Sequence, residues 1–177
     1  MHPFRSRTQL LTVGLLRKPH GHYIGKDFTL GETKIMNWIG PFTIVEVLDK
    51  CLDDSFPRAP EGEGVYVISQ KCWRGKPTKE CIPLYVGSNT GKTKRFRTRI
   101  GDLIADVFGF FGEETGHHSG GISLHRWCRQ ENLNPKNLYI GWLQGCNCVR
   151  CSENSIYDLL KPIWNLKRPQ RCRDHKS

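Results

Sequence analysis

The sequence lacks long hydrophobic runs, internal repeats and low-complexity segments. Its early apolar run, Leu10 to Leu16, is too short to cross a bilayer, and no small-residue cleavage site follows it as a secretory signal requires. We therefore expect a cytoplasmic protein with no membrane partner. At 177 residues, the chain is long enough for one domain with a short extension and too short for two ordinary domains.

The chain has fewer acidic residues than basic ones. Seventeen Asp and Glu face twenty-seven Lys and Arg, which gives a net charge of +10. The cations cluster in Arg5 to Lys26, Lys92 to Arg99 and Lys161 to Lys176, whereas an ordinary solvated surface would spread them evenly. A surplus of this size attracts polyanions, so nucleic acid is the expected partner.

A nucleotide-binding P-loop is also missing, although "GKT" occurs at residues 91–93. The P-loop needs two glycines separated by four residues, because this spacing sets a ring of backbone N–H groups around the phosphates. Counting back from Gly91 puts the required glycine at Val86, and Gly87 lies one residue too close. The sequence therefore argues against an NTPase.

Eight cysteines occur in a chain that carries no other mark of secretion, so reduced thiols or a metal site fit better than disulfides. Cys146, Cys148 and Cys151 are close enough in sequence to share a structural zinc ion. The candidates for a fourth ligand are Cys128, His125 and Cys172. The alternative is that these thiols are ordinary small core residues.

Three short apolar runs rich in β-branched and aromatic residues predict strands, at residues 65–69, 82–87 and 137–144. The first two can pair as an antiparallel hairpin. An apolar stripe from Phe96 to Phe108 predicts an amphipathic helix, and residues 122–130 predict a short second helix. The last helix is expected after Ser152, a good N-cap, and before Pro162.

These elements predict an α+β fold, a small three-stranded and mainly antiparallel sheet flanked by helices in the order ββααβα. We expect the domain over residues 61–168, an N-terminal extension over 1–60 and a basic C-terminal tail over 169–177. Within the extension, residues 41–48 suit either a strand or a helix. The segment 115–121, which contains two histidines and three glycines, is expected to be a loop.

Five short features follow one another in a fixed order. "GVY" at residues 64–66 and "YVG" at 85–87 lie on the two hairpin strands, and "FRTRI" at 96–100 begins the basic helix. Glu153 and Asn165 follow near the C-terminus. This ordered set resembles the GIY-YIG nuclease family. Two literal "YIG" triplets compete, at residues 23–25 and 139–141, but the first precedes "GVY" and the second lacks a following basic helix.

The resemblance implies a divalent-metal-dependent DNA endonuclease that uses Mg²⁺, with Mn²⁺ as a substitute. Glu153 would bind the metal, Tyr66 would act as general base or relay, and Arg99 would grip the phosphate. Tyr85 would orient water or phosphate, and Asn165 would brace the site. The family often has a histidine one turn after the arginine, where this chain has Leu103.

Two assignments within this resemblance stay open. Arg95, one turn before Arg99, is the alternative catalytic arginine. His117 or His118 can replace the missing histidine, although structural or DNA contacts are the favoured roles for these loop histidines. The expected nucleic-acid contacts share a basic or imidazole side chain and are Lys92, Lys94, Arg95, Arg97, His117 and His118.

A restriction-type enzyme is the favoured function, because the extension and inserts can supply sequence specificity. The alternatives are a homing or repair nuclease of the same fold and a non-catalytic nucleic-acid-binding module. A short palindromic target would favour a homodimer by symmetry.

Overall fold

Four antiparallel strands form a single sheet at the centre of the described part of the chain: β1 (Asn37–Thr43), β2 (Gly64–Ser69), β3 (Pro83–Asn89) and β4 (Tyr139–Gln144). Their order across the sheet is β1-β4-β2-β3, so β3 is an edge strand. The computed structural model describes residues 37–59, 61–90, 95–112 and 116–172. The chain divides into two units, Met1–Thr33 and Lys34–Ser177, and every described residue belongs to the second.

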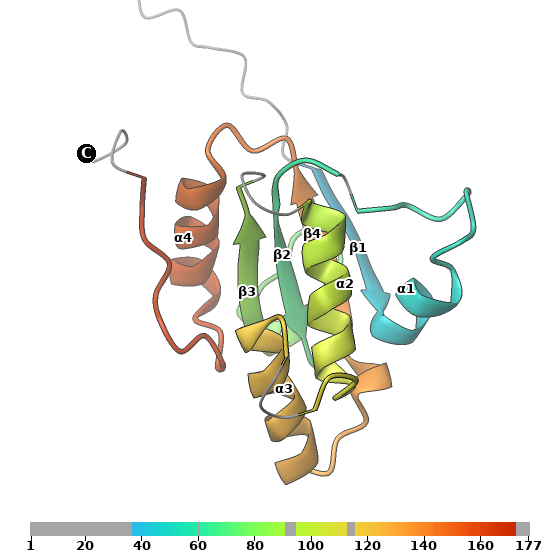
Figure 1. Ribbon diagram of the computed structural model, residues 1–177. Coiled ribbons are helices and arrows are strands. Elements are labelled where there is room, and N and C mark those ends of the chain that lie inside the picture. Colours follow the sequence, from blue (N-terminus) through green and yellow to red (C-terminus); the bar gives the residue numbers. More distant parts are fainter. Residues whose placement is uncertain (1–36, 60, 91–94, 113–115, 173–177) are drawn as a thin grey trace, which may run out of the picture. The chain divides into compact units, whose positions relative to one another are not determined.

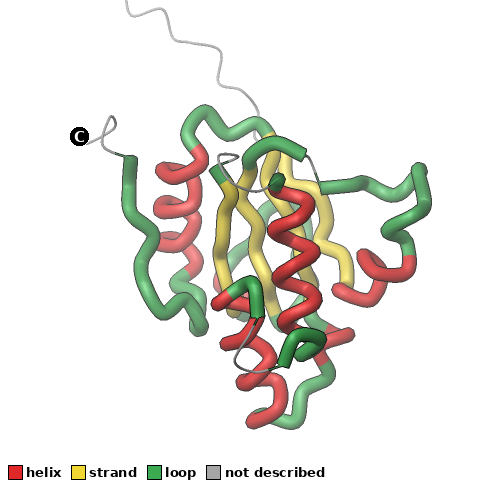
Figure 2. Tube along the Cα trace, viewed as in Figure 1, coloured by secondary structure: helices red, strands yellow, loops and turns green. Residues whose placement is uncertain are grey.

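Helices cover both faces of this sheet (Figures 1 and 2). They are α1 (Ile44–Asp49), α2 (Phe96–Val107), α3 (Ser119–Gln130) and α4 (Val149–Leu160), with short 3-10 turns at Lys79–Cys81 and Pro135–Asn137. α2 and α3 pack in one hydrophobic cluster with one sheet face, and α4 packs in a second cluster with the other face. From β2 onward the order is ββααβα, as the sequence predicts.

β2 is buried along its whole length because helices pack on both of its sides. Val65 and Val67 point to the cluster that contains α4, whereas Tyr66 and Ile68 point to the cluster that contains α2. Successive strand residues face opposite sides of a sheet, so a strand covered on both faces reads as a continuous apolar run. β2 and β3 pair antiparallel, which confirms the expected hairpin.

The sheet has four strands and not the expected three, because residues 37–43 of the expected extension form β1. β1 pairs antiparallel with β4, and its register shifts between Ile39 and Phe42. This irregularity breaks the strict alternation by which a strand is recognised in sequence. The strand ends directly in α1, where Thr43 and Glu46 form a capping box with an N–H···O distance of 2.7 Å from Thr43 to the Glu46 carboxylate.

Two helices begin earlier than the sequence indicates. α4 starts at Val149 with Cys148 as its N-cap, and not after Ser152; the Cys148 thiol accepts a hydrogen bond from the Cys151 N–H. α3 starts at Ser119 and includes the Gly120–Gly121 pair, which the sequence assigned to a loop. No helix in the described ranges has the length and apolar character needed to cross a membrane.

Candidate active site

Tyr66 and Tyr85 lie side by side on the sheet face that α2 and α3 cover. Tyr66 pairs across the hairpin with Gly87, two residues after Tyr85, so both tyrosines project from the same face. Their rings stack with a centroid distance of 6.2 Å. Tyr66 is fully buried, and Tyr85 is partly exposed. The two signature tripeptides therefore bring two phenols together at the edge of the sheet.

Two glycines allow this close approach. A Cβ added at Gly87 would lie 2.3 Å from the Tyr66 hydroxyl oxygen, and one added at Gly120 would lie 2.4 Å from Cζ of Tyr85. Both distances are far below van der Waals contact, so neither position tolerates a side chain unless a tyrosine moves. This explains why α3 carries glycine in its first turn despite the low helix propensity of that residue.

His118 lies next to both tyrosine rings and binds Tyr66 directly. Its Nε2 is 2.6 Å from the Tyr66 hydroxyl oxygen, and its Nδ1 accepts a hydrogen bond from the Gly121 N–H at 3.2 Å. Because Nδ1 accepts, the proton of the neutral ring lies on Nε2, and His118 donates to the phenol oxygen. The His118 backbone N–H in turn donates to the buried Asp106 carboxylate.

Arg99, in the first turn of α2, supplies positive charge to both phenols. Burial raises the pKa of Tyr66 well above its ordinary value, and the charge and hydrogen bond of Arg99 oppose this effect. Burial likewise raises the pKa of Tyr85, again against the charge of Arg99. Arg95 instead lies at the surface, with its guanidinium 3.4 Å from Glu61. The structure thus brings Arg99, and not Arg95, to the tyrosine pair.

Glu153 joins this cluster from α4, on the other side of edge strand β3 (Figure 1). Its carboxylate accepts a hydrogen bond of 2.7 Å from the Ser88 hydroxyl. Burial raises the pKa of Glu153, and the Ser88 hydrogen bond and the charges of Arg99 and Arg150 partly offset the increase. The charge of Glu153 acts on both tyrosines, so these groups form one electrostatic unit.

Asn165 binds the backbone beside the site. Its side-chain oxygen accepts from the Val86 N–H at 2.8 Å, and its amide donates to the Val86 carbonyl at 2.7 Å. Val86, between Tyr85 and Gly87, faces Val67 of β2, and Asn165 binds it on the opposite, outer edge of β3, where the described residues form no further strand. Asn165 therefore fixes the strand that carries Tyr85, which agrees with a bracing role.

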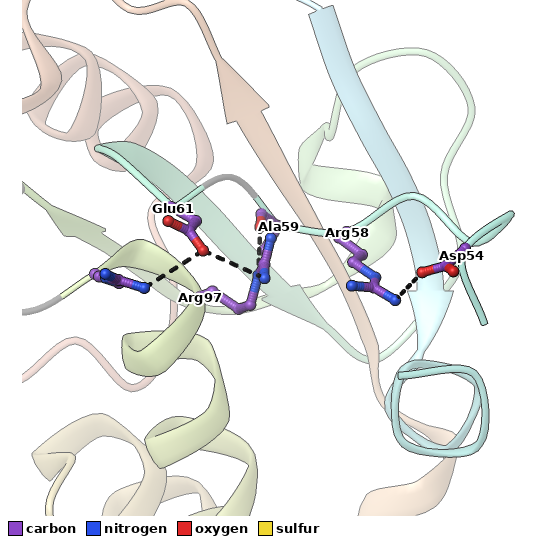
Figure 3. A network of polar contacts seen from close by, with 6 residues as sticks. Asp54, Arg58, Ala59, Glu61 and Arg97 are labelled. Atoms are coloured by element: carbon purple, nitrogen blue, oxygen red, sulfur yellow. Dashed lines mark hydrogen bonds and ion pairs between the residues drawn. The ribbon is translucent and has the colours of Figure 1, made fainter. Parts of the chain in front are cut away.

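The expected nucleic-acid contacts differ in their surroundings. Figure 3 shows Arg97 bound to the Glu61 carboxylate and the Ala59 carbonyl, at 3.6 and 3.1 Å. Arg95 pairs with the same carboxylate, so both arginines lie on the surface at the start of α2. His117 is exposed, with its ring 4.5 Å from Phe111 between centroids. Lys92 and Lys94 lie outside the described residues.

Sequence reasoning missed two features of the site. For His118 the sequence left open a structural role, a DNA contact or replacement of the missing histidine, and it did not indicate the partner; the ring is fully buried and binds Tyr66. Only the side-by-side "HH" in the sequence hinted at it, and nothing there separates His118 from His117. Ser88 was not singled out, although it directly follows "YVG" and points to Glu153.

A separate cluster of thiols lies at the start of α4. Cys148, Cys151 and Cys172 have sulfur atoms within 4.8 Å of one another and can hold a metal ion. The expected ligands Cys146, Cys128 and His125 are not part of this cluster. Cys128 lies on α3 and is buried in the core, and the His125 ring binds the Val107 carbonyl at 3.0 Å.

No family model, curated protein or solved structure matches this chain.

Proposed function

We propose that this protein is a divalent-metal-dependent DNA endonuclease that hydrolyses phosphodiester bonds. The observation that carries the proposal is the convergence of Tyr66, Tyr85, Arg99 and Glu153, which come from four separate elements and share one electrostatic environment. These residues carry the resemblance to the GIY-YIG nucleases. Four residues with only ordinary surface or core roles would not be expected to lie together in this way.

Phosphodiester hydrolysis needs an activated water, neutralisation of the charge on the phosphate, and stabilisation of the leaving oxygen. Arg99 provides the neutralising charge. Its guanidinium is planar and carries five donors, so it can bind a phosphate oxygen while it also donates to Tyr66. The net charge of +10 favours the approach of DNA to this site.

Tyr66 is the proposed proton acceptor for the attacking water. In the free protein its phenol is neutral, because burial raises the pKa of this group. Deprotonation requires donors at the phenolate oxygen, and Arg99 and His118 provide two. Tyr85, stacked beside it and less buried, is placed to orient water or phosphate.

Glu153 is the proposed ligand of Mg²⁺. A buried carboxylate is costly without a cation, and a carboxylate beside a hydroxyl offers the hard oxygen donors that Mg²⁺ prefers. Magnesium sites in phosphoryl-transfer enzymes commonly use one or two carboxylates with water and substrate phosphates, so one acidic side chain is sufficient. When bound there, the ion would stabilise negative charge on the leaving oxygen; Mn²⁺ can substitute.

The test is cleavage of supercoiled plasmid and DNA oligonucleotides in Mg²⁺ or Mn²⁺. Arg99→Ala and Glu153→Gln should each lower the rate at least about a hundredfold, as removal of a transition-state donor does in other enzymes. Lys136→Ala is the control, because Lys136 is an exposed cation in the 3-10 turn Pro135–Asn137, outside the proposed site and the expected DNA contacts. Unchanged DNA with the wild-type protein, or equal losses in the control, would overturn the proposal.

Within this activity, a restriction-type role is the favoured one, and a short palindromic target would favour a homodimer by symmetry. α1 and the turn-rich segment after it lie outside the ββααβα order and can supply sequence-specific contacts. Sequencing of the cleavage products tests this role, since a restriction enzyme cuts at one short sequence. Homing and repair nucleases would give a long asymmetric target or a structure-dependent cut. A non-catalytic module would bind DNA without any product.

A further inference from the structure

Three cysteine sulfur atoms converge where the C-terminal segment meets α4. The Cys172 sulfur lies 3.2 Å from that of Cys151 and 3.5 Å from that of Cys148. Zinc binds thiolate sulfur at about 2.3 Å in a tetrahedron, which separates the ligand sulfur atoms by about 3.8 Å. The two separations from Cys172 are slightly shorter than that value, and all three sulfur atoms lie within 4.8 Å of one another. The cluster therefore needs only small adjustments to enclose one ion.

Two of these thiols lie at the N-terminus of α4. Cys148 is the N-cap and Cys151 lies in the first turn, so two residues separate them, a spacing common in zinc sites. The Cys151 N–H donates to the Cys148 sulfur at 3.4 Å. Backbone N–H groups at a helix N-terminus stabilise negative charge, and a thiolate is the form that binds metal.

The segment after α4 brings the third thiol back to the helix start, and Figure 1 shows it running beside the helix. Asn154, almost fully buried on α4, donates to the Pro169 carbonyl at 2.6 Å and accepts from Arg171 at 2.9 Å. Arg168 pairs with Asp158 further along the helix. These bonds fix the residues directly before Cys172 on α4, so contacts other than its own hold the thiol near the start of this helix.

A disulfide explains this arrangement less well than a metal does. A disulfide would join two of the three sulfur atoms at about 2 Å and leave the third unused, whereas the separations from the Cys172 sulfur are 3.2 and 3.5 Å. A zinc ion uses all three.

We propose that Cys148, Cys151 and Cys172 bind a structural Zn²⁺ ion as thiolates. Binding forms three zinc–sulfur bonds and releases one proton from each thiol. The ion ties the C-terminal segment to the first turn of α4, and Arg171 lies near enough to Cys151 to balance part of the thiolate charge. This site is independent of DNA cleavage, although it orders the turn of α4 from which Glu153 projects.

The first test measures the metal content of the full-length protein, purified under reducing conditions without chelator. We expect one zinc per chain, and at least tenfold less in Cys151→Ser and Cys172→Ser. Cys51→Ser and Cys72→Ser are the controls, because these thiols are exposed and lie outside the cluster. A zinc-free wild type that also fails to bind added Zn²⁺, or equal losses in the controls, would overturn the proposal.

A second test avoids variants, some of which can fail to fold. Co²⁺ replaces zinc in such sites, and the wild-type protein should then show thiolate-to-cobalt charge-transfer bands of an intensity expected for three thiolates, with the visible bands of tetrahedral cobalt. Peptide mapping without reductant tests the alternative, a disulfide within the cluster. A disulfide between any two of the three cysteines in freshly purified protein, with no cobalt spectrum, would reject the site.

Discussion

Tyr66 is the residue on which most of the site's contacts meet. Its hydroxyl binds His118, and its ring stacks on Tyr85. The Gly87 backbone lies close to the same hydroxyl. Burial disfavours the phenolate form of Tyr66 and raises its pKa, whereas the hydrogen bond from Arg99 favours the phenolate and lowers the pKa. The chemistry of the site therefore depends on small changes around one oxygen atom.

Replacement of Gly87 by alanine tests the close packing around Tyr66. The new Cβ would lie 2.3 Å from the phenol oxygen and 2.8 Å from the Tyr85 ring, so both rings must move. We expect cleavage to fall at least about a hundredfold, with a loss of about 1–3 kcal/mol in the free energy of unfolding. The measurements are plasmid cleavage and urea unfolding.

The matched control is Gly101→Ala on the exposed side of α2, where an added Cβ meets nothing within 4 Å. Alanine stabilises a helix relative to glycine by about 0.5–1 kcal/mol, so this variant should keep full activity and unfold no more easily. Full activity in Gly87→Ala would show that Tyr66 needs no fixed position.

The pH dependence of cleavage tests Tyr66 as the proton acceptor. Burial raises the pKa of Tyr66, so the phenolate is scarce at neutral pH and its fraction grows as the pH rises toward that pKa. The logarithm of the cleavage rate at saturating Mg²⁺ should therefore rise with pH with a slope near one. His118→Phe removes a donor to the phenolate, so the rate at neutral pH should fall about tenfold or more and the rise should shift to higher pH.

His117→Phe is the control for this change, because its exposed ring packs on Phe111 and not on the phenols. It should leave the pH profile in place. A profile that is flat above neutral pH in both the wild type and His118→Phe would exclude Tyr66 as the base.

Glu153→Gln separates activity from stability. Burial raises the pKa of Glu153, so the folded protein favours the protonated form and the wild type loses stability as the pH rises through that pKa. Glutamine has no charge to desolvate and keeps an oxygen that can accept from Ser88. Without added metal at neutral pH, the variant should unfold at the same or a higher urea concentration than the wild type while cleavage is lost. Marked destabilisation would indicate a purely structural carboxylate.

At the scale of elements, the sequence predicted those parts whose pattern is set by burial. β2 and β3 are apolar and the Phe96 stripe is one-sided, so the hairpin and α2 are readable from the sequence. The starts of α3 and α4 could not be predicted, because their N-cap residues are a buried histidine and a cysteine, which are unusual caps. In α3, the Gly120–Gly121 pair also resembles a loop sequence. β1 was missed because its register is irregular. The proposed site residues could be chosen by their order along the chain, whereas Ser88 and His118 required the tertiary contacts.

Cys148 has two roles at the start of α4, and serine separates them. The serine hydroxyl is a good N-cap and can accept from the Cys151 N–H, so the metal-free variant should be about as stable as the metal-free wild type. Zinc should raise the melting temperature of the wild type by several degrees and leave Cys148→Ser unchanged. Cys148→Ala, which removes both roles, should also lose about 1 kcal/mol without zinc. Equal zinc responses in wild type and Cys148→Ser would place the metal elsewhere.

At the scale of the whole molecule, the excess of positive charge should govern DNA affinity. Binding that neutralises phosphates releases counterions, so the logarithm of the binding constant falls linearly with the logarithm of the salt concentration. Arg95 and Arg97 are both exposed at the start of α2, next to Arg99, and their surface pairing with Glu61 is weak enough for phosphate to replace it. They are therefore expected to contact DNA phosphates near Arg99.

The double variant Arg95→Gln/Arg97→Gln should weaken binding at low salt and reduce the slope of this plot by about two, roughly one per phosphate contact. Binding is measured in Ca²⁺ or with Glu153→Gln, so that cleavage does not interfere. Lys136→Gln is the control, because Lys136 is an exposed cation in the 3-10 turn Pro135–Asn137, outside the expected DNA contacts. A slope that changes equally in the control would mean that only overall charge attracts DNA; an unchanged slope in the double variant would move the DNA path away from α2.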